Sequence, residues 1–131
     1  MSDPFVDQPE DVPAAFARLD SARPLALDTE FMRERTYFPQ LALVQCADAT
    51  GQVLLIDPLD PGMLDPLATL IAGIHALMHS ASEDLVAFRH TLGILPRSLY
   101  DTQIAAAFAG LGAGIGYQSL VKTLLGIDLP K

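Results

Sequence analysis

The sequence lacks the features of a secreted or membrane protein. Cys46 is the only cysteine, so no internal disulfide can form, and a reducing, cytoplasmic setting fits best. The N-terminal segment Met1-Ser2-Asp3-Pro4 has no basic start followed by an apolar core, so it does not match a signal peptide. No uncharged apolar run reaches the ~18 residues that a membrane span needs. We therefore expect no membrane partner.

Basic residues are also scarce. The chain has 8 Lys and Arg residues against 16 Asp and Glu residues, which gives a formal net charge of -8 at pH 7. Simple nucleic-acid binders rely on Lys and Arg to contact phosphates, so this chain is a poor match to that class. An enzyme that holds phosphates through metal ions gathers acids instead, so nucleic-acid chemistry is not excluded. Any broad basic surface would have to lie outside this chain.

The apolar residues present are sufficient for one folded α/β domain. Hydrophobic residues make up 50% of the 131 residues, which argues against disorder. The first half predicts three strands with an antiparallel hairpin, and the second half alternates helix and strand, which implies a mixed sheet with helices on its faces. The expected strands are Leu25–Phe31, Leu41–Cys46, Gln52–Asp57, His75–His79 and Ser98–Asp101. The expected helices are Pro9–Asp20, a helix from Asp65 that ends near Gly73, a helix that begins after Ser80 or Ser82 and ends at Gly93, Thr102–Phe108 and Gln118–Leu125. Asp11 is expected to cap the first of these helices, and Ser80 or Ser82 the third.

Two carboxylates stand close together at the end of the first of these strands. In the stretch Leu25-Ala-Leu-Asp-Thr-Glu-Phe31, Asp28 and Glu30 are two residues apart and therefore point to the same face. Adjacent carboxylates repel each other unless protons or cations compensate, and oxygen-only ligands favour Mg²⁺ or Mn²⁺ over zinc. The alternative is a strand whose exposed face carries two acids, and this motif alone does not exclude it.

A second acidic segment follows His79, where a strand gives way to a helix. In sheets with parallel strands, sites form at the carboxyl ends of the strands, where this turn and the first two acids lie. Glu83 and Asp84 fall in the first helical turn, where acids interact favourably with the helix dipole, and we favour that role for Glu83. The apolar residues of this helix that we expect to face inward are Leu85, Val86 and Phe88.

Four segments, in this order and spacing, closely resemble the ribonuclease D family. These are bacterial 3′–5′ exoribonucleases of the DEDD superfamily. The segments are Leu25–Phe31, Arg33–Gln40, His79–Leu85 and Asp101–Ala106, and the likeness runs from about Pro24 to Lys131. The resemblance implies a ribonuclease H-like mixed sheet, an antiparallel three-stranded meander plus parallel strands, flanked by helices.

The resemblance also implies the roles of the acids. Asp28 and Glu30 match the first exonuclease motif and Asp84 matches the acid of the second. In the family these catalytic carboxylates hold two Mg²⁺ or Mn²⁺ ions, which clamp the attacking and leaving oxygens of an in-line displacement at phosphorus. The implied reaction releases a nucleoside 5′-monophosphate from an RNA 3′ end, with precursor tRNA as the usual substrate.

The family's third motif, a tyrosine and a fourth aspartate on a later helix, is expected beyond Lys131. Tyr117 and Asp128 do not lie in the sequence setting of that motif. We therefore interpret residues 1–131 as the N-terminal part of a 3′–5′ exonuclease domain, truncated before the third motif. We expect this fragment to bind metal weakly and to be inactive on its own. We also expect it to self-associate through the sheet face that truncation leaves exposed, with exchange of the C-terminal helix as one route.

Several residues near the acids are candidates for substrate contacts. Thr29 and Phe31 are candidates to contact the terminal nucleotide, by a backbone amide and by stacking respectively, with plain core as the alternative for Phe31. Arg33, Arg35 and Tyr37 are candidates for contacts with RNA phosphates or bases, with a solvated loop as the alternative.

Three other positions are interpreted structurally. We expect Asp101 to cap a helix and support the site without ligating metal. His79 is expected to pack at the strand end, and Cys46 to lie in the core. Two other functions remain open: a non-catalytic RNA- or protein-binding module of ribonuclease H-like fold, and a 3′–5′ exonuclease that acts on DNA, which lacks the 2′-hydroxyl of RNA.

Overall fold

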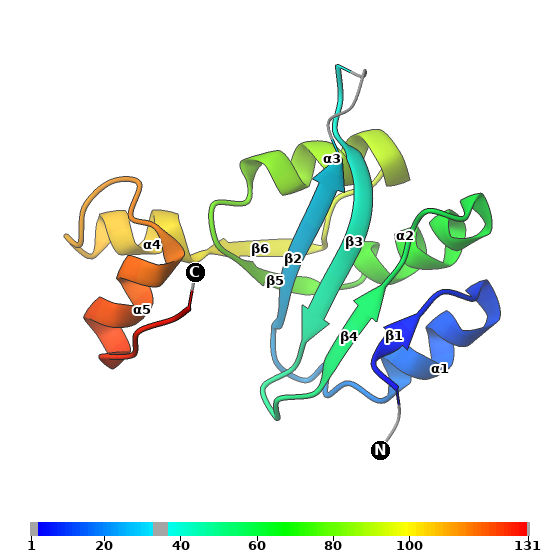
Figure 1. The fold of residues 1–131 in the computed structure, drawn as a ribbon, viewed down its shortest axis with the longest axis horizontal. Coiled ribbons are helices and arrows are strands. Elements are labelled where there is room, and N and C mark those ends of the chain that lie inside the picture. Colours follow the sequence, from blue (N-terminus) through cyan, green and yellow to red (C-terminus); the bar gives the residue numbers. More distant parts are fainter. Residues whose placement is uncertain (1–2, 33–36, 131) are drawn as a thin grey trace.

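The fold is organised around a six-stranded sheet with strand order β1-β4-β3-β2-β5-β6 (Figure 1). The computed structural model describes residues 3–32 and 37–130. The long strands β2 and β3 lie at the centre of the sheet, and the shorter strands lie on either side. The strands are β1 (Phe5–Val6), β2 (Leu25–Met32), β3 (Gln40–Ala47), β4 (Val53–Ile56), β5 (His75–Met78) and β6 (Ser98–Asp101).

The pairing of the strands confirms the predicted mixed sheet. β2, β3 and β4 form an antiparallel meander, because β3 pairs with both neighbours in the antiparallel sense. β5 pairs in parallel with β2, and β6 pairs in parallel with β5. β1, which pairs in parallel with β4, was not predicted, since its two residues are too few to show a periodic pattern.

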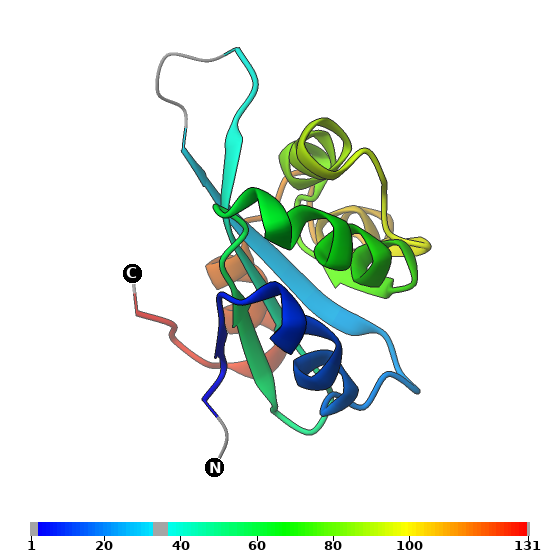
Figure 2. The ribbon, with the colours of Figure 1, turned by 90° about the vertical axis from the view of Figure 1, so that its right-hand side faces the viewer.

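Three helices cover one face of the sheet and bury the core. Figure 2 shows α1, α2 and α3 on the same side, and between them and the sheet lie the largest fully buried side chains, including Phe88, Leu25 and Leu67. The described residues contain no helix long and apolar enough to cross a membrane. The helices are α1 (Val12–Ala17), α2 (Leu64–Ala72), α3 (Ser82–Leu92), α4 (Thr102–Phe108) and α5 (Tyr117–Leu125), with 3-10 turns η1 (Pro9–Asp11) and η2 (Pro61–Met63).

The last two helices, α4 and α5, stand off the end of the sheet beyond β6 (Figure 1). Leu120 is buried there, but Phe108 is 90% exposed and Leu125 is largely exposed. The ring of Tyr117 makes an edge contact with the ring of His79 at the end of β5. This lobe therefore contributes little to the main core and leaves apolar side chains in water.

The first predicted helix was too long. In place of one helix over Pro9–Asp20, the 3-10 turn η1 leads into α1, which ends at Ala17. Asp11 occupies the N-cap position of α1, but its side chain makes no capping hydrogen bond. Asp11 is itself part of the 3-10 turn, so its backbone has the helical conformation that a capping side chain does not favour.

Two predictions for α3 were also wrong. Neither Ser80 nor Ser82 caps this helix, because Ala81 occupies the N-cap position and makes no side-chain capping bond. The carboxylate of Asp101 accepts the N–H groups of Ser80 and Ala81 in the turn that precedes the helix. Val86 is 46% exposed, since the face that meets the sheet is formed by residues three and four apart. The buried residues of that face are Asp84, Ala87 and Phe88, and Leu85 is partly buried.

Candidate active site

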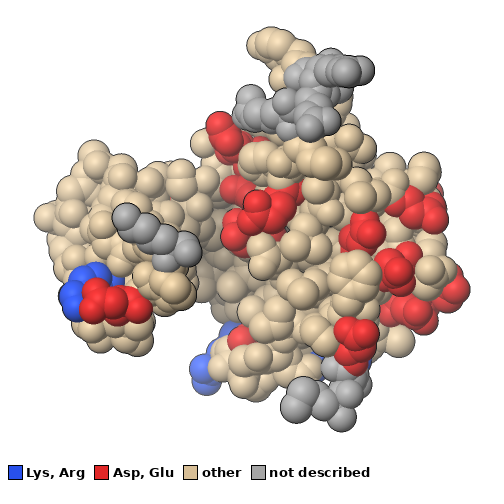
Figure 3. All heavy atoms as spheres, in the orientation of Figure 1, with Lys and Arg blue, Asp and Glu red and all other residues tan. Residues whose placement is uncertain are grey.

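The two faces of β2 separate apolar from acidic side chains. Leu25, Leu27 and Thr29 are buried under the helices, whereas Asp28 and Glu30 are exposed on the opposite face. This alternation follows from the two-residue period of a strand and places the two acids on one face, as predicted. Figure 3 views the molecule from this open side, where acidic side chains gather over β2.

The third predicted acid, Asp84, comes to this strand from the first turn of α3. It is 7% exposed, and its Oδ1 accepts a hydrogen bond from the hydroxyl of Thr29. Burial raises the pKa of Asp84 above its ordinary value, the hydrogen bond from Thr29 opposes that rise, and the negative charge of Asp28 adds to it. Asp28 and Asp84 are therefore close enough for their charges to interact.

The chemistry of this donor set fits a hard divalent cation. Carboxylate oxygens are the ligands that Mg²⁺ and Mn²⁺ prefer, and a cation would relieve the repulsion between Asp28 and Asp84. Across residues 3–32 and 37–130, however, no three His, Cys, Asp or Glu side chains are already grouped so that they could hold a metal ion. The metal ligands Asp28, Glu30 and Asp84 therefore stay a prediction.

Thr29 makes contacts that sequence reasoning missed. Its backbone N–H, which we predicted to meet the substrate, donates to Oδ1 of Asp28 at 2.9 Å. Its hydroxyl donates to Asp84 on the other side of the strand. No local sequence pattern links residues 29 and 84, so this contact became visible only once the sheet and α3 were in place.

Two aromatic residues, Tyr37 and Phe38, precede β3. Tyr37 is 90% exposed and meets Phe38 edge-on, with ring centroids 5.0 Å apart. Phe38 in turn stacks on His90 of α3 at 4.3 Å. Phe31 is partly buried and packs against the core. The remaining candidates for RNA contacts, Arg33 and Arg35, lie outside the described residues.

Asp101 caps α4, as predicted, and also fixes the turn before α3. Its carboxylate accepts the N–H of Gln103 in α4, at 2.8 Å, and those of Ser80 and Ala81, at 3.0 and 2.8 Å. Burial raises the pKa of Asp101, but these hydrogen bonds outweigh it and hold the pKa below its ordinary value. Asp101 therefore connects the end of β6 to the segment that presents Asp84.

A cavity of about 590 Å³ opens on the uncovered face of the sheet beside Asp28. His79 lines it and connects neighbouring segments, because its ring nitrogens bond to the hydroxyl of Thr102 and to the carbonyl of Ile115. Sequence reasoning placed His79 at a strand end but did not predict these partners. Cys46 lies in the core, as expected, and burial is the main cause that raises its pKa to about 12.

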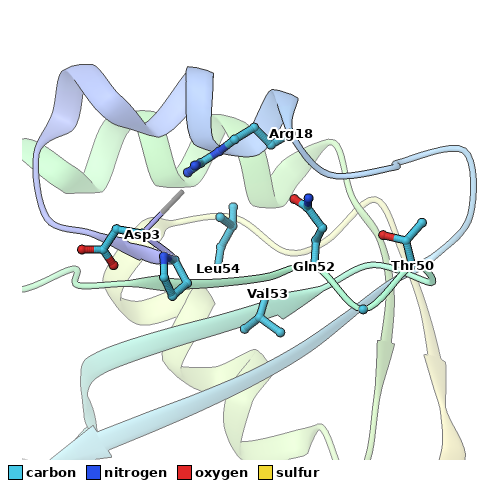
Figure 4. A pocket seen from close by; sticks show the side chains of 8 residues that line it. Asp3, Arg18, Thr50, Gln52, Val53 and Leu54 are labelled. Carbon is cyan, nitrogen blue, oxygen red and sulfur yellow. The ribbon is translucent and has the colours of Figure 1, made fainter. Parts of the chain in front are cut away.

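A second cavity, of about 610 Å³, lies between α1 and the turn that joins β3 to β4 (Figure 4). Arg18 reaches over it from the C-terminal end of α1, which it directly follows, and Thr50 and Gln52 line it from the turn. None of the predicted site residues lines this cavity. The candidate active site is therefore the open face of β2.

A family model described as 3′–5′ exonuclease matches residues 4–131. The chain belongs to this 3′–5′ exonuclease family. Exonucleases of the family generally use divalent metal ions, which agrees with the carboxylates gathered around β2. The resemblance to ribonuclease D predicted from four sequence segments is confirmed by curated relatives and by solved structures.

Among the curated relatives of this exonuclease chain, ribonuclease D of Xanthomonas oryzae pv. oryzae is 58% identical over 118 residues, which cover 87% of this chain and 32% of the relative. Ribonuclease D of Escherichia coli is 44% identical over 109 residues, which cover 82% of this chain and 29% of the relative. The chain thus spans about a third of the length of the curated relatives it matches.

Solved structures confirm the fold. The crystal structure of Escherichia coli RNase D matches with a TM-score of 0.85 and 37% identity, over 99% of this exonuclease chain and 35% of that chain. Trypanosoma brucei RNase D in complex with RNA U12 matches with a TM-score of 0.79 over 96% of this chain and 48% of that chain. At 22% identity the second match shows the shared fold alone.

Proposed function

We propose that this chain is the acid-bearing part of a metal-dependent 3′–5′ exoribonuclease of the ribonuclease D type. The observation that carries the proposal is the meeting of two acidic segments: Asp28 and Glu30 share the open face of β2, and α3 brings Asp84 within electrostatic reach of Asp28. Membership of the 3′–5′ exonuclease family supports this reading of the acids.

The residues that would hold the metal are Asp28, Glu30 and Asp84. When bound, two Mg²⁺ or Mn²⁺ ions would activate a water for attack on the phosphate of the terminal nucleotide and stabilise the leaving 3′ oxygen of the nucleotide before it. Asp28 and Glu30 offer exposed carboxylates on the open face, while Asp84 is buried and accepts a hydrogen bond from the hydroxyl of Thr29. The same acids exclude a substrate phosphate in the absence of cations, because like charges repel.

RNA 3′ ends are the proposed substrate, and tRNA 3′-end processing is the proposed role. The name ribonuclease D of the relatives supports RNA, and the Escherichia coli structure is described as an exoribonuclease involved in structured RNA processing. Tyr37 supports an RNA contact in this chain, because its exposed ring, which meets Phe38 edge-on, can stack on a base. We keep Arg33 and Arg35 as proposed phosphate contacts and Phe31 as a proposed stacking residue.

We further propose that residues 1–131 are inactive on their own. The tyrosine and fourth aspartate of the third motif would lie in the part of the relatives that this chain does not span. The test is degradation of a 5′-labelled RNA in Mn²⁺ by this chain and by the same protein extended through its reading frame. Activity in the extended form alone supports the proposal. Activity in neither form rejects the exonuclease, and activity in the short form rejects the need for a fourth acid.

A non-catalytic RNA- or protein-binding module is the second candidate function. It is favoured by the lack, among the described side chains, of a ready-made group of three metal ligands. Retention of RNA by both forms without release of nucleotide at any Mn²⁺ concentration would establish it. The same assay with competing DNA 3′ ends tests the DNA exonuclease alternative, because only RNA offers a 2′-hydroxyl.

The open sheet face and the α4–α5 lobe make self-association a further proposal. Val53 on the open face and Phe108 in the lobe expose apolar surface that a second copy could cover. Static light scattering over a concentration series tests it: a rising mass supports association, and a constant monomer mass rejects it.

The single buried Cys46 supports a cytoplasmic location.

A further inference from the structure

Thr29 stands between the two acids of β2 but points the other way. It is 6% exposed, and in the part of the chain that the structure describes, the polar or charged side chains that are buried are Thr29 and Asp84. These two side chains are hydrogen-bonded to each other, so neither leaves an unpaired polar group in the core.

One residue therefore contacts both acidic segments. The N–H of Thr29 donates to Oδ1 of Asp28 at 2.9 Å, and its hydroxyl donates to Oδ1 of Asp84. The first contact is local, but the second joins β2 to α3 across the sheet-helix boundary. Because it is buried, this second bond is shielded from water that would otherwise compete for the carboxylate.

We propose that Thr29 is a positioning residue, whose hydroxyl fixes the orientation in which the Asp84 carboxylate is offered to a divalent ion. The inference rests on the proposed metal-dependent function. On this proposal, the middle residue of Asp28-Thr29-Glu30 fixes the position of Asp84 relative to the two acids of β2.

The chemistry of threonine suits this position. Its β-branched side chain has few χ1 rotamers on a strand, so the hydroxyl is held in one direction with little loss of entropy. Valine has the same shape but no donor, and would leave the buried Asp84 carboxylate without this partner. Serine keeps the donor but has a freer rotamer. The pair Thr29→Val and Thr29→Ser thus separates the hydroxyl from the packing.

The experiment is isothermal titration of Mn²⁺ into the 131-residue chain and its variants. Loss of a hydrogen bond that orients a metal ligand typically weakens metal binding by about 10–100-fold, which is the result expected for Thr29→Val. Thr29→Ser should restore most of the affinity. The matched control is Thr69→Val on α2, which removes a hydroxyl bonded to the carbonyl of Asp65 and should leave Mn²⁺ affinity unchanged.

A second pair of titrations tests whether Thr29 acts through Asp84. In an Asp84→Asn background, Thr29→Val should weaken Mn²⁺ binding no further, because the carboxylate that it orients has been removed. An equal loss in both backgrounds would overturn the proposal, as would a folded Thr29→Val protein that binds Mn²⁺ as tightly as wild type. If Thr29→Val does not fold, Thr29→Ala is compared in the same way.

The outcome for the wild-type chain separates this inference from the proposed function. If wild type binds no Mn²⁺, the proposed metal site fails, and the contact is then tested by ¹³C NMR of the Asp84 carboxyl carbon. Thr29→Val should shift that signal while the carboxyl signals of Asp7 and Asp11 stay in place. An Asp84 signal that does not move would overturn the positioning role.

Discussion

The two faces of β2 have different tasks, although the same eight residues form both. The face under α1, α2 and α3 carries Leu25 and Leu27, whose burial stabilises the fold. The open face carries the exposed carboxylates of Asp28 and Glu30, which are the proposed metal ligands. The residues that stabilise the fold and those proposed to act on a substrate therefore lie on opposite faces of one strand. Thr29 and Asp84 connect the two, since they belong to the acidic segments but are buried with the core.

The largest loss in the free energy of unfolding should come from truncating a side chain in the core between the helices and the sheet. Phe88→Ala removes a fully buried ring and should lower the free energy of unfolding by about 3–5 kcal/mol. The matched control is Phe108→Ala, which truncates a ring that is 90% exposed and should cost no more than about 0.5 kcal/mol. Urea unfolding of both variants gives the two values. Equal losses would break the contrast between the core and the α4–α5 lobe.

A smaller loss in the free energy of unfolding is expected when Asp101 is substituted. Asp101→Asn gives up one of the oxygens that accept the N–H groups of Ser80, Ala81 and Gln103, and should cost about 1 kcal/mol at pH 7. Because the pKa of Asp101 is lowered in the folded state, its contribution is present above the ordinary value of 3.8 and is lost as the pH falls through the lowered pKa. The difference between wild type and variant in urea titrations should therefore shrink toward pH 2. A difference in stability that stays constant with pH would show that the ionised Asp101 carboxylate is not the source of the stabilisation.

Asp84 should show the opposite dependence on pH. Its pKa is raised in the folded state, so the folded chain holds the proton more tightly than the unfolded chain. Its contribution to stability is greatest below the ordinary value of 3.8 and declines as the pH rises through the raised pKa. Asp84→Asn, which can still accept from Thr29, should thus gain stability over wild type at pH 7 and lose that gain at pH 3. A loss of stability at pH 7 would show that the buried charge is compensated.

The smallest expected effect is on the labelling rate of Cys46, which lies near the C-terminal end of β3. Its thiol is buried and has a pKa of about 12, so thiolate is scarce and hidden in the folded chain. Labelling by a thiol reagent at pH 8 should be slow and should accelerate when urea unfolds the chain. Fast labelling without urea would mean that this part of the sheet opens readily.

Much of the fold could be predicted from local patterns. The alternation in Leu25–Phe31 placed Asp28 and Glu30 on one face, and the capping residue Asp101 fixed the start of α4 at Thr102. β1 escaped prediction because it has only two residues and depends on pairing with β4. Local propensity also failed at α3, where neither Ser80 nor Ser82 caps the helix and Asp101, distant in the sequence, accepts the N–H groups of Ser80 and Ala81 in the preceding turn.

The candidate site was predictable in its acids but not in their connections. Asp28, Glu30 and Asp84 lie in recognisable motifs, because the proposed metal chemistry demands particular residue types at particular spacings. The bond between Thr29 and Asp84 has no such signature, since any small residue between two acids gives the same strand pattern. The same holds for His79, whose partners Thr102 and Ile115 come from segments that only the fold brings together.

The most direct test of the account is Mn²⁺ binding by the open face of β2. Isothermal titration would compare wild type with the double variant Asp28→Asn/Glu30→Gln, and with Asp7→Asn/Glu10→Gln, which removes the same charge from exposed acids elsewhere. The account predicts that Mn²⁺ binding is lost in the first variant and kept in the second. Binding as tight as wild type after Asp28 and Glu30 are neutralised would contradict the claim that this face holds the metal.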